Sequence, residues 1–94
     1  MKISFDPLKN AWNIRERGVA FDAVREFDFE NALVRVDERC DYGETRYVAL
    51  GELRARLHVV CFTETPDGIR VISLRKANNR EVRRHAEVQA TDER

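Results

Sequence analysis

The chain has 94 residues, 43% of them apolar and 36% charged, a composition that fits one compact domain over residues 1–94 and leaves no room for a second. Its 17 basic side chains are balanced by 17 acidic ones, so the net charge alone argues against a generic nucleic-acid-binding protein. No apolar run approaches the ~20 residues of a membrane span and no signal-peptide core is present, so we expect a cytoplasmic protein without membrane contact.

The N-terminal third predicts two helices. Asp6 is a good N-cap with Pro7 at the first helical position, and Gly18 is a good stop for this first helix. Residues 19–33 carry apolar side chains near helical spacing and predict a second short helix. The opening stretch "MKISF" leaves open a short edge strand before the first helix.

The middle of the chain changes to the composition of β-strands. The four runs are "ALVRVDE", "TRYVALGEL", "RLHVVCFTET" and "GIRVISLRK". The separators "LRA" and "TPDG" are short enough for hairpin turns, which predicts an antiparallel meander. A last helix is expected with Asn78 or Asn79 as its cap, and Glu81 follows Asn78 at the three-residue spacing of a capping box. The predicted fold is therefore α+β, with two N-terminal helices, a four-stranded antiparallel sheet and a C-terminal helix.

Charge is distributed unevenly along this neutral chain. Residues 70–84 carry six basic side chains against Glu81 alone, whereas residues 22–44 carry eight acidic side chains against three arginines. Such polarisation predicts one surface for an anion and another for a cationic partner.

Strand alternation predicts a packed face and an open face. The packed face would hold Val48, Leu50, Val60, Phe62, Ile72 and Leu74. The open face would hold Tyr47, Ala49, Val59, Cys61, Thr63, Val71, Ser73 and Arg75. We expect the open face, with basic residues from the last helix, to bind a phosphate backbone while Tyr47 stacks on a base.

A plain solvated surface is the alternative, because arginines of the last helix stand at sequence spacings from Glu81 and Glu87 that allow ion pairs. His58 and His85 lie in apolar patterns without a triad or metal-ligand spacing, so we expect no metal and no cofactor. Cys40 and Cys61 have different surroundings, and we expect both to be reduced.

Several short motifs occur together in the chain. The stretch "FDPLKNAWNIRERGVAF" resembles the N-terminal signature of BrnT-type toxins of bacterial type II toxin-antitoxin systems. The matching residues are Phe5, Asp6, Lys9, Asn13, Gly18, Val19 and Phe21. The later segment "RVISLRKA" is similar to another part of that family, through Arg70, Ile72, Ser73, Arg75, Lys76 and Ala77. The family usually has Lys-His before the glycine, where this chain has Glu16 and Arg17, of which Arg17 still supplies a cation.

The resemblance implies a RelE-like fold and a ribonuclease that inhibits translation and growth. It also implies a cognate ribbon-helix-helix antitoxin (BrnA-type) that forms a hetero-oligomer with the toxin, and binding to operator DNA only through that complex. Either the acidic segment or the basic site would be available to the antitoxin.

Metal-independent RNA cleavage can use the substrate's 2′-hydroxyl as nucleophile, and arginines suit the stabilisation of the added negative charge. As catalytic residues we predict Arg70 and Arg75 at the scissile phosphate, with Lys76 and Arg80 at flanking phosphates. As RNA-binding residues we predict Tyr47, Thr63, Ser73 and Arg83. Glu44, Glu64 and His58 are open alternatives for the general base.

Two other classes of protein could use the same basic residues of the segment 70–84. One is a nucleic-acid-binding module without enzymatic activity, and the other is a protein-interaction module whose arginines form an interface.

Overall fold

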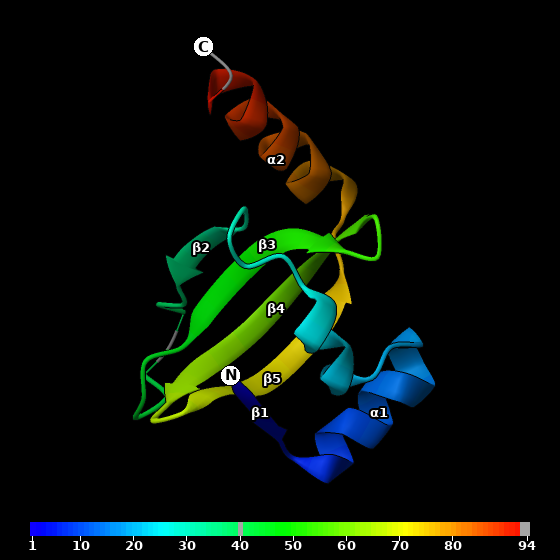
Figure 1. The fold of residues 1–94 in the computed structure, drawn as a ribbon, viewed down its shortest axis with the longest axis vertical. Coiled ribbons are helices and arrows are strands. Elements are labelled where there is room, and N and C mark those ends of the chain that lie inside the picture. Colours follow the sequence, from blue (N-terminus) through cyan, green and yellow to red (C-terminus); the bar gives the residue numbers. More distant parts are fainter. Residues whose placement is uncertain (40, 93–94) are drawn as a thin grey trace.

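The computed structural model describes residues 1–39 and 41–92 and has a single five-stranded sheet at its centre (Figure 1). The strands lie in the order β1-β5-β4-β3-β2, with β1 parallel to β5 and all other neighbours antiparallel. The elements in chain order are β1 (Lys2–Phe5), α1 (Pro7–Arg17), the 3₁₀ helix η1 (Phe21–Glu26), β2 (Leu33–Val36), β3 (Tyr47–Leu53), β4 (Arg56–Thr65), β5 (Gly68–Lys76) and α2 (Asn79–Asp92).

This architecture corrects the predicted one. The sheet is mixed and five-stranded instead of four-stranded and antiparallel, because the N-terminal residues form the edge strand that the sequence left open. The prediction of a second N-terminal α-helix is wrong, since residues 19–33 contain the six-residue 3₁₀ helix η1 and end at the first residue of β2. The antiparallel meander of β2 to β5, the first helix and the last helix are confirmed.

Helix α1 begins and ends at the expected signals. The Asp6 Oδ1 atom accepts a hydrogen bond from the Leu8 amide at 2.8 Å, and Pro7 occupies the first turn. Gly18 adopts a left-handed φ of 72°, and its N–H donates to the Ile14 carbonyl. Among the described residues no helix is long and apolar enough to cross a membrane.

The 3₁₀ form of η1 follows from a three-residue spacing of its apolar side chains. Phe21, Val24 and Phe27 recur every third residue, and three residues make one turn of a 3₁₀ helix. All three are buried against the sheet, and the chain is already extended at Phe27. In an α-helix these three side chains would point in different directions, so their shared contact with the core favours the 3₁₀ form over the predicted α-helix.

The packed face of the sheet also differs from the prediction in β3. Ala49 pairs directly with Val60 and shares its face, so Ala49 is in the core and Val48 is on the other side. The prediction chose the bulkier residues, but the core needs small ones there. A Cβ on Gly51 would come within 2.8 Å of the Phe27 ring, which shows how closely the chain just after η1 approaches β3.

Tyr47 is placed on the packed face as well. Its ring stacks on Phe62, with centroids 5.6 Å apart and planes at 26°. The structure therefore puts Tyr47 on the opposite side of the sheet from Cys61, which pairs with Val48, and from Ser73, which pairs with Cys61.

A β-bulge in β5 changes which of its residues share a face. Cys61 pairs with Ser73, but the next residue, Phe62, pairs with Val71, so Ile72 is the extra residue. Simple alternation places Arg70 opposite to Ser73 and Arg75. The bulge brings all three to one face and sends Val71 to the core, contrary to the predicted places of Val71 and Ile72.

Helix α2 projects from the end of β5 and does not cover the sheet (Figure 1). Its start is the expected capping box, in which the Glu81 amide donates to Asn78 Oδ1 and the Asn78 amide donates to Glu81 Oε1, each at 2.9 Å. This helix therefore depends on its first turn for its position.

The hairpin between β3 and β4 carries strain that a substitution should relieve. Arg54 and Ala55 have φ values of 52° and 63°, which glycine adopts more readily than alanine. We expect Ala55→Gly to raise the free energy of unfolding by about 0.5–1 kcal/mol in denaturant titrations. Ala11→Gly, the same change inside α1, should lower it by a similar amount. A loss of stability in both variants would contradict this account of the turn.

Candidate phosphate-binding site

Four arginines converge over the face of the sheet opposite to η1. They line a hollow of about 200 Å³, which we call the arginine pocket. Its lining residues are Arg17, Arg35, Arg39, Val48, Val59, Cys61, Ser73 and Arg75. They come from α1, β2, the segment after β2, and the three central strands, so only the folded chain assembles them.

Strand register explains why the pocket forms here. Arg35 pairs with Val48, Val48 with Cys61, and Cys61 with Ser73, which makes one continuous row across four strands. Directly paired residues point to the same face of a sheet. Val59 and Cys61 are only 5% and 6% exposed, as expected where long arginine side chains lie over apolar surface. Burial accordingly raises the pKa of the Cys61 thiol.

Arg39 is held over the pocket by Asp37. Arg39 Nε donates to Asp37 Oδ1 at 2.8 Å and its Nη2 to Oδ2 at 2.7 Å, a two-pronged ion pair. The Asp37 side chain is fully buried and also accepts from the Tyr42 hydroxyl at 3.2 Å, while the Arg39 side chain is 72% exposed. The buried carboxylate thus anchors a guanidinium that still faces solvent.

The hydrogen bonds from Arg39 hold the pKa of Asp37 far below its ordinary value. A carboxylate with a lowered pKa stabilises the folded state at all pH values above its unfolded pKa of about 4. We expect Asp37→Asn to be less stable than the wild type at pH 7. The difference should shrink as the pH falls below about 4 and vanish below the folded pKa. Thermal unfolding from pH 7 to pH 2 measures it, and a difference that grows in acid would contradict this assignment.

Arg75 is held by the first turn of α2. Its Nη1 and Nη2 atoms donate to the two Glu81 carboxylate oxygens at 2.8 and 3.0 Å. These hydrogen bonds raise the pKa of Arg75 and lower that of Glu81. The capping box therefore orients a pocket arginine besides starting the helix.

Arg17 and Arg35 have no carboxylate partner among the residues that the structure describes. Arg17 instead donates to Asn13 Oδ1 at 3.4 Å and lies over the Trp12 ring. The pocket therefore has four guanidinium groups against the two carboxylates that bind them, Asp37 and Glu81. This excess of positive charge favours an anionic ligand.

The structure brings together some of the predicted site residues. Ser73 and Arg75 line the arginine pocket. Arg70 and Thr63 pair with each other farther along the same face, where Arg70 forms an ion pair with Glu44 at 2.7 Å and the Thr63 hydroxyl donates to the Thr45 carbonyl. Their contact with RNA stays a prediction.

The other predicted residues lie elsewhere. Lys76 lines a neighbouring hollow with Arg54, Arg56 and His58, which meets the arginine pocket at Arg17. Arg80 and Arg83 are exposed on the projecting helix α2, and none of the described hollows includes them. Sequence reasoning missed Arg35 and Arg39 altogether, although an arginine between the valines of "LVRV" was an available signal.

The three general-base alternatives do not line the arginine pocket. His58 is buried, with Nδ1 at 2.9 Å from the Arg56 carbonyl oxygen. Glu44 is bound by Arg70 and Arg46, which lower its pKa. Glu64 is hydrogen-bonded to Tyr47 on the packed side. The described lining of the pocket contains neither a carboxylate nor an imidazole, so the chemistry it offers is charge stabilisation.

Half of the eight acidic residues in the predicted acidic surface are paired with arginines. Asp22, Glu26, Asp37 and Glu44 each form an ion pair with an arginine. Cys40, which belongs to the same segment, lies outside the described residues. No group of three His, Cys, Asp or Glu side chains with a metal-ligand arrangement occurs in residues 1–39 and 41–92.

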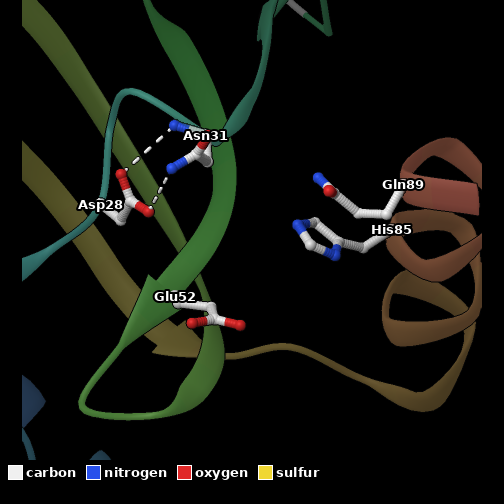
Figure 2. Close-up of a pocket in the computed structure, with 5 residues that line it drawn as sticks. All are labelled: Asp28, Asn31, Glu52, His85 and Gln89. Carbon is white, nitrogen blue, oxygen red and sulfur yellow. Dashed lines mark hydrogen bonds between the residues drawn. The ribbon is translucent and has the colours of Figure 1, made fainter. Parts of the chain in front are cut away.

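A second hollow has the opposite chemistry. Figure 2 shows His85 and Gln89 of α2 pointing across it toward the end of β3, where Asp28, Asn31 and Glu52 lie. Asp28 accepts hydrogen bonds from the Asn31 side chain and backbone. With two carboxylates in its lining, this hollow disfavours a phosphate, so the arginine pocket is the better candidate for an anion.

Comparison with known families agrees with this chemistry. A model of the family described as "Ribonuclease toxin, BrnT, of type II toxin-antitoxin system" matches residues 5–81. The match runs from the end of β1 to the first turn of α2, so it includes every residue that lines the arginine pocket. A search of curated proteins returns no match.

Proposed function

The chain belongs to the BrnT family of ribonuclease toxins, and we propose that its arginine pocket holds the RNA phosphate at which it cleaves. Membership in a type II toxin-antitoxin family also means that the protein has an antitoxin partner. The observation that carries the proposal is the convergence of Arg17, Arg35, Arg39 and Arg75 over one face of the sheet. Guanidinium groups stay charged at any physiological pH and match the geometry of phosphate oxygens.

The proposed reaction is metal-independent transesterification. The 2′-oxygen adjacent to the scissile phosphate attacks phosphorus and loses its proton, while the bond to the 5′-oxygen breaks and that oxygen gains a proton. The products are a 2′,3′-cyclic phosphate and a free 5′-hydroxyl. The phosphoryl oxygens gain negative charge in the transition state, and prepositioned arginines stabilise it.

The anchored arginines suit this role best. Arg75 and Arg39 are each fixed by a two-pronged carboxylate contact, so little reorganisation is needed when the charge develops. We assign Arg75 to the scissile phosphate, with Ser73 beside it. Arg70 farther along the same face and Lys76 in the neighbouring hollow are proposed to contact flanking phosphates.

The antitoxin is proposed to be a ribbon-helix-helix protein of the BrnA type that covers the arginine pocket in a hetero-oligomer. Operator DNA would then be bound by the complex, through the antitoxin. Cleavage of cellular RNA would inhibit translation and growth in the cytoplasm. Four of the eight acidic residues in the acidic segment are paired with arginines, which favours the arginine pocket over that segment as the antitoxin surface.

The test is cleavage of RNA by the purified protein in the presence of EDTA. The proposal expects discrete products with cyclic phosphate ends, and no cleavage at a position where a single 2′-deoxynucleotide replaces the ribonucleotide. Binding without products would instead indicate a nucleic-acid-binding module. Absence of binding even at low salt, where phosphate contacts are strongest, would indicate a protein-interaction module.

A further inference from the structure

We propose that Trp12 and Arg17 form a subsite that stacks a nucleobase of the RNA whose phosphate lies in the arginine pocket. This inference rests on the proposed function, because it concerns the nucleotide next to that phosphate. It replaces Tyr47, which the structure places on the packed face, as the stacking residue.

The subsite is a groove of about 220 Å³ between α1 and β5. Its lining includes Lys9, Trp12, Asn13, Arg17, Ile72 and Ser73. Two of these, Arg17 and Ser73, also line the arginine pocket, so the two hollows adjoin. One RNA strand can therefore place a phosphate in the arginine pocket and a neighbouring base in the groove.

Trp12 presents a flat apolar surface to this groove. It is 44% exposed, which is unusual for the largest side chain, and the Arg17 guanidinium lies 4.9 Å from the centre of its ring. Stacking on an aromatic ring or an arginine plane is the common way in which proteins hold unpaired bases. Because the Arg17 guanidinium lies over the Trp12 ring, the two groups form one stacked pair, and a base can extend that stack from its open side.

The two side chains are held in place from below. Asn13 is 1% exposed, and its Nδ2 donates to the Val19 carbonyl at 2.9 Å while its Oδ1 accepts from Arg17. The neighbouring Asn10 accepts from the Phe21 amide at 2.9 Å, which ties α1 to η1. The helix that carries Trp12 and Arg17 is thus fixed relative to the sheet before a ligand binds.

Charge distinguishes an RNA ligand from a protein partner on this surface. The groove is lined by Lys9 and Arg17, and its described lining contains no carboxylate. Leu8 and Ile14 are also exposed on α1, at 81% and 48%, but neither lines the groove. A general apolar docking surface would use those side chains, whereas a base-stacking site uses only Trp12.

Trp12 is the chain's only tryptophan, so its fluorescence reports directly on the subsite. The probes are two oligonucleotides of about ten units with 2′-O-methyl riboses, one carrying uracil throughout and one without bases. They have the same phosphates. We expect the uracil oligonucleotide to quench the fluorescence and to bind about tenfold more tightly than the abasic one.

Variants then test whether Trp12 causes this difference in affinity. Trp12→Ala should lose about tenfold in affinity for the uracil oligonucleotide and nothing for the abasic one, whereas Trp12→Phe should keep most of the affinity. Leu8→Ala is the matched control and should change neither. Circular dichroism establishes that each variant is folded.

Three results would overturn the subsite. Equal binding of both oligonucleotides by the wild type would remove the stacking contribution while leaving the phosphate site intact. Unchanged RNA affinity in Trp12→Ala together with weaker antitoxin binding would make the surface a protein interface. No binding of either oligonucleotide at low salt would contradict the proposed RNA site itself, and the subsite with it.

Discussion

Replacing Arg75 by alanine is expected to slow RNA cleavage by about 100- to 1,000-fold, the usual effect of removing one prepositioned donor from a transition-state charge. Arg75 is the pocket arginine with the firmest support, since it lies on β5 and both of its terminal nitrogens are bound by Glu81. Cleavage of RNA in a single turnover, with enzyme in excess over RNA, measures the rate of the chemical step without product release.

The matched control for this change is Arg83→Ala. Arg83 belongs to the same basic run in the sequence but is exposed on α2, away from the pocket. It should reduce cleavage by no more than about threefold, through weaker long-range attraction of RNA. Arg75→Lys should be intermediate, because the charge remains but the two-pronged contact is lost. Equal losses in Arg75→Ala and Arg83→Ala would place the active surface on α2.

Gly68→Ala is expected to lower the free energy of unfolding by about 3 kcal/mol or more. Gly68 begins β5 directly beside Lys2 of β1. A Cβ added there would come 2.6 Å from the Lys2 backbone nitrogen and closer still to its carbonyl oxygen. Backbone atoms cannot move aside as a side chain can, so β1 has to separate from β5.

That separation would expose Ile3 and Phe5, which pack at the edge of the core. The midpoint of thermal unfolding should fall by about 10 °C or more. Gly43→Ala is the control, since a Cβ at Gly43 meets no atom within 4 Å and only the φ of 70° opposes it. That variant should lose about 1 kcal/mol. Similar stability of Gly68→Ala and the wild type would contradict the parallel pairing of β1.

Local signals in the sequence correctly predict the helix ends and turns that depend only on neighbouring residues. Asp6, Pro7 and Gly18 bound α1 as expected, and Asn78 with Glu81 forms the capping box of α2. The turn at Pro66 and Asp67 joins β4 and β5, because Thr65 pairs with Gly68. Each of these depends on contacts within a few residues, which propensity and turn chemistry describe well.

The features that were missed depend on contacts between distant segments. Phe27 follows η1 into the core because Gly51 leaves room for its ring, and Gly51 lies far from Phe27 in the sequence. The bulge at Ile72 changes the face of Arg70, and alternation cannot reveal an extra residue. Arg35 and Arg39 reach the pocket only through strand register and the buried anchor Asp37. The basic run at residues 70–84 therefore contributed Ser73 and Arg75 to a site whose other arginines come from elsewhere.

The most direct test of the arginine pocket as the RNA site is NMR of the protein with ¹⁵N-labelled arginines, titrated with uncleavable 2′-O-methyl RNA. The side-chain Nε–H signals of Arg17, Arg35, Arg39 and Arg75 should shift together and saturate at one affinity, while those of Arg80 and Arg83 stay in place. Shifts confined to the arginines of α2, with the pocket signals unchanged, would contradict the account.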